Sequence, residues 1–260
     1  HVFINTGYGW VENNTPWANT FGYGDLSDGS TAFGDVNGDG LSDLIVASSS
    51  THQVLLNTGN GWQVNNAWNF PAGNFKNFGT QILDADSDGM LDFLIHYNGE
   101  TPQLYLNRGA IPDVLTSLNN GIGGVTSIEY DISTKYQNTY FPFPVPVVKS
   151  TTASDAFGHS YQTQYSYANG LWNAAERESR GFGYVKVTDP EGSYSETWFL
   201  QDDIYKGRPQ RQETHDAVGN LFSKSTNTWN YQEIIPGVKF IYLQRKDNFV
   251  YDGDQTGRRT

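Results

Sequence analysis

The chain has 260 residues and a strongly acidic balance, with 28 Asp and Glu against 16 Lys and Arg, a net charge of −12, no Cys and one Met. This length allows one large domain or two smaller ones, and the lack of Cys excludes disulfides, thiol nucleophiles and Cys-ligated metal sites. No apolar run reaches the roughly 18 residues of a membrane-spanning helix, and an acidic chain lacks the basic footprint that nucleic acid or an anionic membrane requires. We therefore expect no nucleic-acid partner and no direct membrane insertion. We also expect any secretion signal to lie outside the chain, because it opens without a basic and apolar leader.

Aromatic residues make up 15% of the chain, and it contains 28 Gly. Aromatic side chains favour pleated strands, and Gly with Asn and Asp favours the turns between them. No long stretch repeats its apolar residues with the helical period near 3.6. The composition predicts an all-β protein of extracellular, secreted type.

A repeat of about fifty residues organises the first half. The segment VFINTGYGWVENNTPW at residues 2–17 returns as VLLNTGNGWQVNNAW at residues 54–68 and, more briefly, as LYLNRGAIPD at residues 104–113. Between these copies, FGDVNGDGLSDLIV at residues 33–46 matches ILDADSDGMLDFLI at residues 82–95. A unit of this length with several short strands is typical of a β-propeller blade, and a β-sandwich with duplicated hairpins is the alternative.

The repeat supplies only about two blades, whereas propellers close with about four to eight. We therefore expect residues 1–112 to be a partial propeller that packs against further blades of a longer parent chain. On its own, such a pair would leave the apolar strands at residues 44–47 and 93–95 partly uncovered. The isolated segment would then self-associate or be poorly soluble.

Two Asp-rich loops carry the strongest chemical signal. Oxygen ligands at positions 1, 3, 5 and 9 of a nine-residue loop, with Gly at position 6 and a carbonyl at position 7, suit a hard cation. The predicted Ca²⁺ ligands are Asp35, Asn37, Asp39, Asp43 and the Leu41 carbonyl in the first loop, and Asp84, Asp86, Asp88, Asp92 and the Met90 carbonyl in the second. Position 12 is Val46 or Ile95 rather than Glu, so these are not EF-hands but loops between two strands. A metal-free Asx-turn is the alternative, and Mg²⁺ fits less well because it retains its waters.

The acidic loops and the fifty-residue repeat end near Asp113, and we assign residues 113–260 to a second region. Strands are predicted at residues 161–167, 183–188, 194–200 and 221–229, separated by Asp-x-x-Gly turns at residues 155–158, 189–192 and 216–219. Alternating prolines at Pro142, Pro144 and Pro146 predict an unpaired edge or connector.

The acidic loops resemble the FG-GAP/VCBS repeats of integrin-like propellers. Four later stretches resemble the middle region of the B component of Tc insecticidal toxin complexes, which SpvB-type and other RHS-repeat (YD-repeat) toxins share. These stretches begin PDVLTSLNNGIGG, FPFPVPVVKSTTASD, AERESRGFGYVKV and KGRPQRQETHDAVGN. The segment HDAVGN at residues 215–220 looks like a first YD repeat with His215 in place of Tyr.

The resemblance implies a propeller that docks the pore-forming A component and an antiparallel RHS-like sheet that opens a β shell around a toxic cargo, with an RHS C component as a further partner. A calcium-dependent adhesin or glycan-binding propeller, with a host-surface glycan as its ligand, is the alternative. Such a lectin would continue its fifty-residue repeat after Asp113, and this chain abandons it.

We expect no enzymatic activity. The five histidines form no HxxxH or HExxH pair, which argues against a His-based metal site, and the chain has no nucleophile elbow or phosphate loop. Asp202 with Asp203, and Glu176 with Glu178, are the only pairs that suggest glycosidase carboxylates. Solvated charge explains them better, and Asp202 and Asp203, as direct neighbours on a strand, would point to opposite faces.

Overall fold

The computed structural model describes residues 2–13, 17, 29–48, 51–68, 75–76, 79–96, 101–111, 113–251 and 258–259. In these ranges the chain is all-β with antiparallel pairing between neighbouring strands, and its only helices are two 3₁₀ turns, η2 (Asn66–Trp68) and η3 (Ser133–Lys135). No helix among the described residues is long and apolar enough to cross a membrane. The chain divides into two compact units, His1–Asp113 and Val114–Thr260, which are described in turn.

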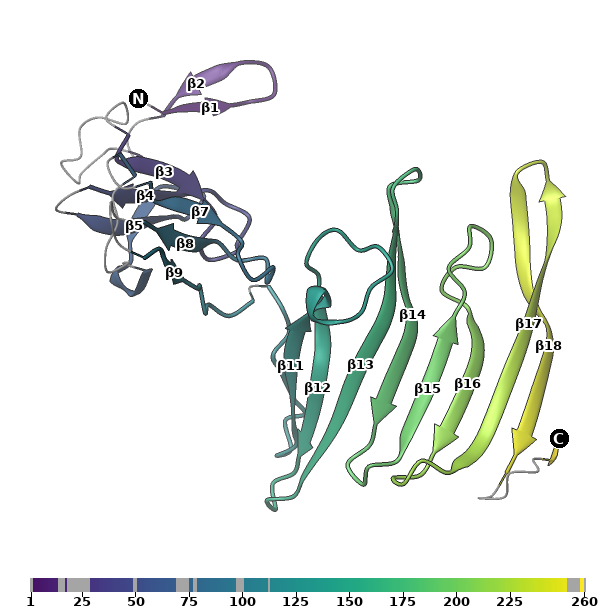
Figure 1. Cartoon of the computed structure of the whole chain (residues 1–260). Coiled ribbons are helices and arrows are strands. Elements are labelled where there is room, and N and C mark those ends of the chain that lie inside the picture. The colour runs from purple at the N-terminus through teal and green to yellow at the C-terminus, as the bar shows by residue number, and fades with distance from the viewer. Residues whose placement is uncertain are drawn as a thin grey trace. The chain divides into compact units, whose positions relative to one another are not determined.

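The described residues of the first unit form three small antiparallel sheets, of two, four and three strands in chain order (Figure 1). The strands are β1 (Phe3–Asn5) and β2 (Trp10–Glu12); β3 (Thr31–Gly34), β4 (Asp43–Ala47), β5 (His52–Asn57) and β6 (Trp62–Val64); and β7 (Gln81–Leu83), β8 (Asp92–Ile95) and β9 (Gln103–Tyr105).

The sequence repeat is also a structural repeat. Hairpin β1–β2 closes with a bond from the Thr6 amide to the Gly9 carbonyl at 2.9 Å, and β5–β6 closes with the equivalent bond from Thr58 to Gly61 at 3.0 Å. In both hairpins the Asn side chain that ends the first strand accepts a bond from the amide of the Gly two residues later. The repeated Asn-x-Gly sequence therefore forms the same turn in both hairpins.

The core of the first unit consists of aliphatic side chains on β4 and β5. Ile45, Ala47 and Val54 form a buried cluster with Val36 of the loop after β3, and Ile82 of β7 and Phe93 of β8 pack against it. The expectation that residues 44–47 and 93–95 are partly uncovered is wrong for most of them. Ile45 and Ile95 have no exposed surface, because the neighbouring sheets cover one another.

Gly34, at the end of β3, permits this close packing. A Cβ at this position would lie 2.4 Å from Cδ1 of Leu91, which is too short for a non-bonded carbon–carbon contact, so the Leu91 side chain would have to move. The Gly of the Phe-Gly-Asp sequence therefore lets Leu91 pack directly against the strand.

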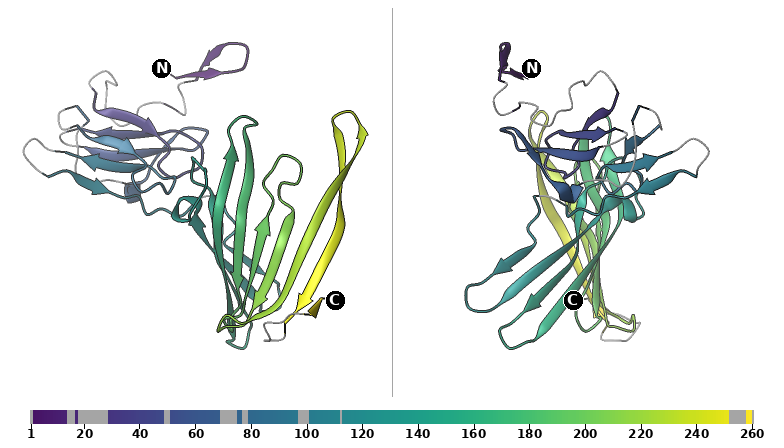
Figure 2. Two further views of the ribbon diagram at one scale, coloured as in Figure 1. Left: turned by 45° about the vertical axis from the view of Figure 1, so that its right-hand side comes forward. Right: turned by 90° about the vertical axis from the view of Figure 1, so that its left-hand side faces the viewer.

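The second unit is a single ten-stranded antiparallel sheet whose strands follow chain order from β10 to β19. They are β10 (Ser117–Asn119), β11 (Val125–Ile132), β12 (Pro146–Ser154), β13 (Ser160–Asn173), β14 (Glu178–Thr188), β15 (Tyr194–Phe199), β16 (Pro209–His215), β17 (Leu221–Ile235), β18 (Val238–Val250) and β19 (Arg258–Arg259). The two views of Figure 2 show β11 to β18 as one twisted layer of long strands.

The three Asp-x-x-Gly turns predicted from the sequence are present, and they join β12 to β13, β14 to β15 and β16 to β17. In each turn the first Asp accepts a bond on its side chain from the amide two residues later. The Gly adopts a φ of about 90° in all three, at Gly158, Gly192 and Gly219. Such a φ is readily accessible only to Gly, which explains the shared pattern.

The structure refines the proline prediction. Pro142 and Pro144 lie outside the strands, but Pro146 is the first residue of β12 and pairs with Ile132 of β11. The first position of a strand tolerates Pro because its missing N–H interrupts no ladder. Only the first two prolines therefore belong to a connector.

Candidate metal centre

The two acidic loops, residues 35–43 and 84–92, are the connections of two equivalent hairpins. Gly34 pairs with Asp43 across β3 and β4, and Leu83 pairs with Asp92 across β7 and β8. Each loop therefore begins immediately after one strand, and its last Asp is the first residue of the next.

The first acid of each loop binds backbone amides. The Asp35 carboxylate accepts bonds from the amides of Gly38 and Gly40, both at 2.7 Å. The Asp84 carboxylate accepts bonds from the amides of Asp88 and Gly89, both at 3.0 Å. These bonds curl each loop around its first carboxylate.

The ninth position is different because its carboxylate is fully buried. Asp43 and Asp92 have no exposed surface. Asp43 accepts bonds from the amides of Val36 at 2.9 Å and Asn57 at 2.7 Å. Burial raises the pKa of Asp43 above its ordinary value, although these two bonds act to lower it. Asp92 accepts the equivalent bonds from Ala85 and Asn107, both at 2.8 Å. The ninth Asp thus ties the start of its loop to the far end of the third strand of each repeat, at Asn57, the last residue of β5, or at Asn107, just after β9.

Asn57 and Asn107 were not among the residues predicted for this site, although both lie in the repeated segments at residues 54–68 and 104–113. Besides the amide bond to the ninth Asp, Asn57 donates from its side chain to the Ser42 carbonyl at 3.1 Å. Asn107 donates from its side chain to the Val36 carbonyl at 2.7 Å, which links the two repeats. Both asparagines follow the ninth Asp of their loop at nearly the same distance, 14 residues for Asn57 and 15 for Asn107, and this near-regular spacing was the available signal.

The second loop gathers its acids closely. One carboxylate oxygen from each of Asp84, Asp86 and Asp88 lies within 4.8 Å of the others. Burial, followed by the charge of Asp86, raises the pKa of Asp88. Arg108 lies 3.6 Å from Asp86 and offsets part of this repulsion. A divalent cation between the three oxygens would remove it.

The first loop has the same fold with a less charged centre. Asn37 replaces the second acid, and its amide donates to Asp39 at 3.0 Å. Among the described residues, the first loop's acids do not form a group as close as that of the second. Ca²⁺ takes six to eight oxygen ligands, so the oxygen-rich donor set of both loops suits it, and the second loop is the better prearranged. Leu41 and Met90, whose carbonyls were predicted ligands, follow the central acid of each loop, and their amides bond to it at 2.8 Å.

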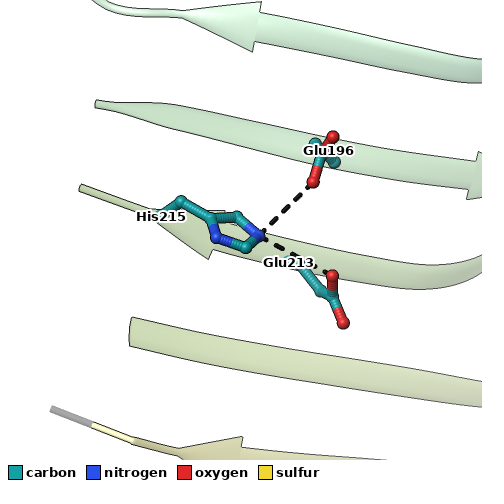
Figure 3. A group of neighbouring side chains, drawn as sticks. All are labelled: Glu196, Glu213 and His215. Carbon is teal, nitrogen blue, oxygen red and sulfur yellow. Dashed lines mark ion pairs between the residues drawn. The ribbon is translucent and has the colours of Figure 1, made fainter. Parts of the chain in front are cut away.

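A second group of potential ligands lies in the other unit, where Glu196, Glu213 and His215 come together on β15 and β16 (Figure 3). HxxxH and HExxH motifs indicate metal sites whose histidines lie on one helix. A group assembled across two strands leaves no such motif, so the expectation that a His-based site is absent did not cover it.

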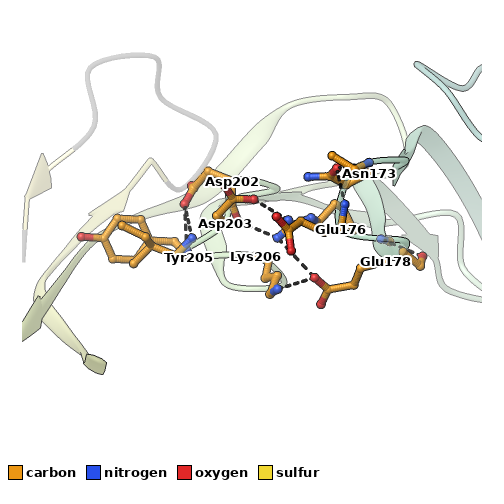
Figure 4. Close-up of polar contacts among 12 residues, drawn as sticks. Asn173, Glu176, Glu178, Asp202, Asp203, Tyr205 and Lys206 are labelled. Atoms are coloured by element: carbon orange, nitrogen blue, oxygen red, sulfur yellow. Dashed lines mark hydrogen bonds and ion pairs between the residues drawn. The ribbon is translucent and has the colours of Figure 1, made fainter. Parts of the chain in front are cut away.

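Of the four carboxylates considered as glycosidase candidates, Glu178 and Asp203 take part in ion pairs, and Asp202 and Glu176 lie in hydrogen-bonded turns (Figure 4). Asp203 pairs with Arg180, whose side chain is 1% exposed. Glu178 pairs with Lys206 at 2.5 Å, and this bond lowers the pKa of Glu178. Asp202 accepts bonds from the amides of Ile204 and Tyr205, and Asn173 caps the turn that carries Glu176. These contacts hold the β15–β16 connection against β14 and the turn before it.

Two protein families match this chain. The family described as the insecticide toxin TcdB middle/N-terminal region matches residues 57–212, which is more than half of the chain. The chain belongs to this family. The FG-GAP repeat also matches, over residues 29–61, which include the first acidic loop. A search of curated protein sequences finds no match.

Solved structures share the fold. A TcdB2–TccC3 complex without its hypervariable C-terminal region matches with a TM-score of 0.72 and 19% identity. A second TcdB2–TccC3 structure matches at 0.72 and 20%, and a Photorhabdus luminescens Tc holotoxin pore with a substitution in TccC3 matches at 0.72 and 19%. Each match covers 86% of this chain but only 15% of the other, so this chain spans about a seventh of those proteins.

Proposed function

We propose that this chain is a non-catalytic structural and assembly segment of a secreted Tc-type toxin. In this proposal, the first unit contributes blades to a calcium-stabilised propeller that docks a partner subunit. The second unit is the opening wall of a β shell that encloses a toxic cargo. The partners are the pore-forming A component and an RHS-type C component.

The observation that carries the proposal is the ten-stranded sheet in chain order, in a chain of the TcdB middle-region family. Its strands reach 15 residues, yet Ile132 and Val147 are the only described hydrophobic residues in it that are less than 9% exposed. A single layer with two open faces suits a wall better than a self-contained globular domain, which needs two packed layers.

Assembly is the direct test. The chain would be mixed with the pore-forming component and with the RHS component of a Tc complex, in calcium and in EDTA, and complexes measured by native mass spectrometry. We expect a complex in calcium and a weaker one in EDTA. Failure to bind either component in calcium would contradict the proposal.

Calcium binding at the two acidic loops is the finer part of the proposal. It is supported by the three close carboxylates of the second loop, and by the equivalent hairpin that carries the first loop. Calorimetric titration should give two calcium sites in the chain. Asp39→Ala and Asp88→Ala should each remove one site, because position 5 lies at the centre of its loop.

Asp113→Asn is the matched control for these variants. Asp113 is an exposed acid outside both loops with a φ of 56°, a conformation that Asn accepts well. It should keep both sites. Equal calcium stoichiometry in all the variants would show that the loops are metal-free Asx-turns.

The alternative, a calcium-dependent adhesin or glycan-binding propeller, requires the fifty-residue repeat to continue. Residues 114–251 instead form the long-stranded sheet. Binding to a glycan array that calcium promotes and Asp88→Ala abolishes would favour the adhesin over the assembly segment.

A further inference from the structure

The group on β15 and β16 lies on one face of the second unit's sheet. Glu196 pairs directly with Glu213 across the two strands, and Tyr194 pairs with His215. Alternate residues of a strand point to the same face, so Glu196, Glu213 and His215 share it. Figure 3 shows the His215 ring directed between the two carboxylates.

Three atoms converge at this point. His215 Nε2 lies 3.3 Å from Glu196 Oε2 and 3.7 Å from Glu213 Oε2. This nitrogen is buried, and no hydrogen-bond partner for it exists in the described part of the chain. Buried polar nitrogens are rarely left without a partner.

The other polar atom of each side chain is already occupied. His215 Nδ1 lies 3.3 Å from the Gly219 carbonyl, which accepts a bond when Nδ1 carries the proton. Glu196 Oε1 accepts a bond from the Tyr184 hydroxyl. Glu213 Oε1 accepts bonds from Arg211 Nε at 2.9 Å and Nη2 at 2.6 Å.

These outer contacts orient the ligand atoms. With the proton on Nδ1, Nε2 presents a lone pair to two carboxylate oxygens, an arrangement that is repulsive unless a cation lies between them. The Tyr194 ring stacks on His215 at 4.7 Å and fixes its plane. A His that donates its second N–H to a carbonyl, beside hydrogen-bonded carboxylates, is the usual surrounding of a metal ligand in proteins.

We propose that Glu196, Glu213 and His215 form a binding site for a zinc-like divalent transition-metal ion. Ligand distances of about 2.0–2.2 Å in a tetrahedron place neighbouring ligand atoms about 3.3 Å apart, close to the two separations measured here. Imidazole with carboxylates suits zinc rather than calcium. The three residues leave a fourth position for water.

Nearby positive charges limit the affinity of this site. Arg211 and Lys224 both approach Glu213 Oε1, Lys224 at 3.6 Å, and Lys186 lies over the Tyr194 ring. The competing occupant is a proton on His215. The site is separate from the acidic loops, which belong to the first unit and offer only oxygen ligands.

The test is titration of the whole, untagged chain with ZnCl₂ by calorimetry, with calcium present to occupy the acidic loops. We expect one zinc site that His215→Ala and Glu196→Gln each weaken by tenfold or more. Tyr184→Phe, which removes only the outer hydrogen bond, should weaken it within the 10–100-fold range of such contacts. Co²⁺ in place of zinc should give the visible absorption of a tetrahedral complex.

His159→Ala is the matched control. His159 lies in the β12–β13 turn, 64% exposed and 2.7 Å from Asp155, and its loss should leave zinc binding unchanged. Glu196→Gln keeps the shape of the side chain, so it separates loss of metal from loss of fold. No zinc binding, or binding that survives both His215→Ala and Glu196→Gln, would overturn the proposal. So would NMR evidence that His215 stays doubly protonated in the presence of zinc.

Discussion

The two units of this chain are held together in different ways. Strands of the first unit are three to six residues long, and it buries Ile45, Leu55 and Ile95 completely. Strands of the second unit reach 15 residues, and the charged residues Arg180 and Glu213 are among its few buried ones. Packing between sheets stabilises the first unit. The second depends on ladder hydrogen bonds, cross-strand pairs and ion pairs, which do not require a second layer packed on either face of the sheet.

The largest effect should come from the core of the first unit. Ile45→Ala removes a fully buried side chain from the cluster with Val36, Ala47 and Val54. We expect a loss of about 3 kcal/mol in the local free energy of opening, because a buried Ile lost to Ala leaves a cavity. Hydrogen exchange of the β4 and β5 amides would measure it. Equal loss of protection in β13 and β14 would show that the units are not independent.

Calcium should stabilise the first unit and leave the second unchanged. A ligand that binds only the folded state adds about 2.7 kcal/mol at a hundredfold excess over Kd. Hydrogen exchange in millimolar CaCl₂ and in EDTA should therefore differ in β3 to β9 and remain equal in β11 to β18. Identical exchange in the first unit would contradict calcium binding.

Arg180→Ala tests the ion-pair network of the second unit. Arg180 pairs with Asp203 and lies 3.7 Å from Glu178, and its side chain is almost fully buried. We expect a loss of about 2 kcal/mol from the removed charged hydrogen bonds, seen as faster exchange in β14 and in the connection 200–208. Arg245→Ala, an exposed ion-pair change on β18, is the control and should have little effect.

The smallest change in stability should come from Glu178→Gln. The bond from Lys206 lowers the pKa of Glu178 in the folded chain. The stability it contributes is therefore present above the unfolded pKa of a glutamate, about 4.3, and is lost as pH falls through the lower folded pKa. In thermal melts, the variant should show less acid sensitivity than the parent below that pH. Unchanged acid sensitivity would mean that this exposed pair contributes nothing.

Much of the fold could be predicted where a local signal specified it. Asn-x-Gly, the Asp-rich loops and the Asp-x-x-Gly turns all depend on residues close in sequence, and the structure shows each of these turns. Strands β16 and β18 were not predicted. A sheet with two open faces has no clean alternation of apolar and polar residues, so PQRQETH and VKFIYLQRKDNFV carry little strand pattern.

The group on β15 and β16 was missed for a different reason. Glu196 meets Glu213 only because of the register across the connection between Phe199 and Pro209, which includes a register shift at Trp198 and Phe199. No sequence motif determines that register. The acidic loops could be found because all their predicted ligands lie within nine consecutive residues.

The chain order of the ten-stranded sheet has a kinetic consequence. Each strand from β11 to β18 pairs only with the strands immediately before and after it. Most connections between these strands are short, and loop-closure entropy rises only slowly with length for the longest, residues 133–145, so the entropy lost at each step is small. The sheet can therefore grow one hairpin at a time as the chain leaves the ribosome. Each new hairpin covers the open edge left by the one before it, the edge at which unfinished sheets aggregate.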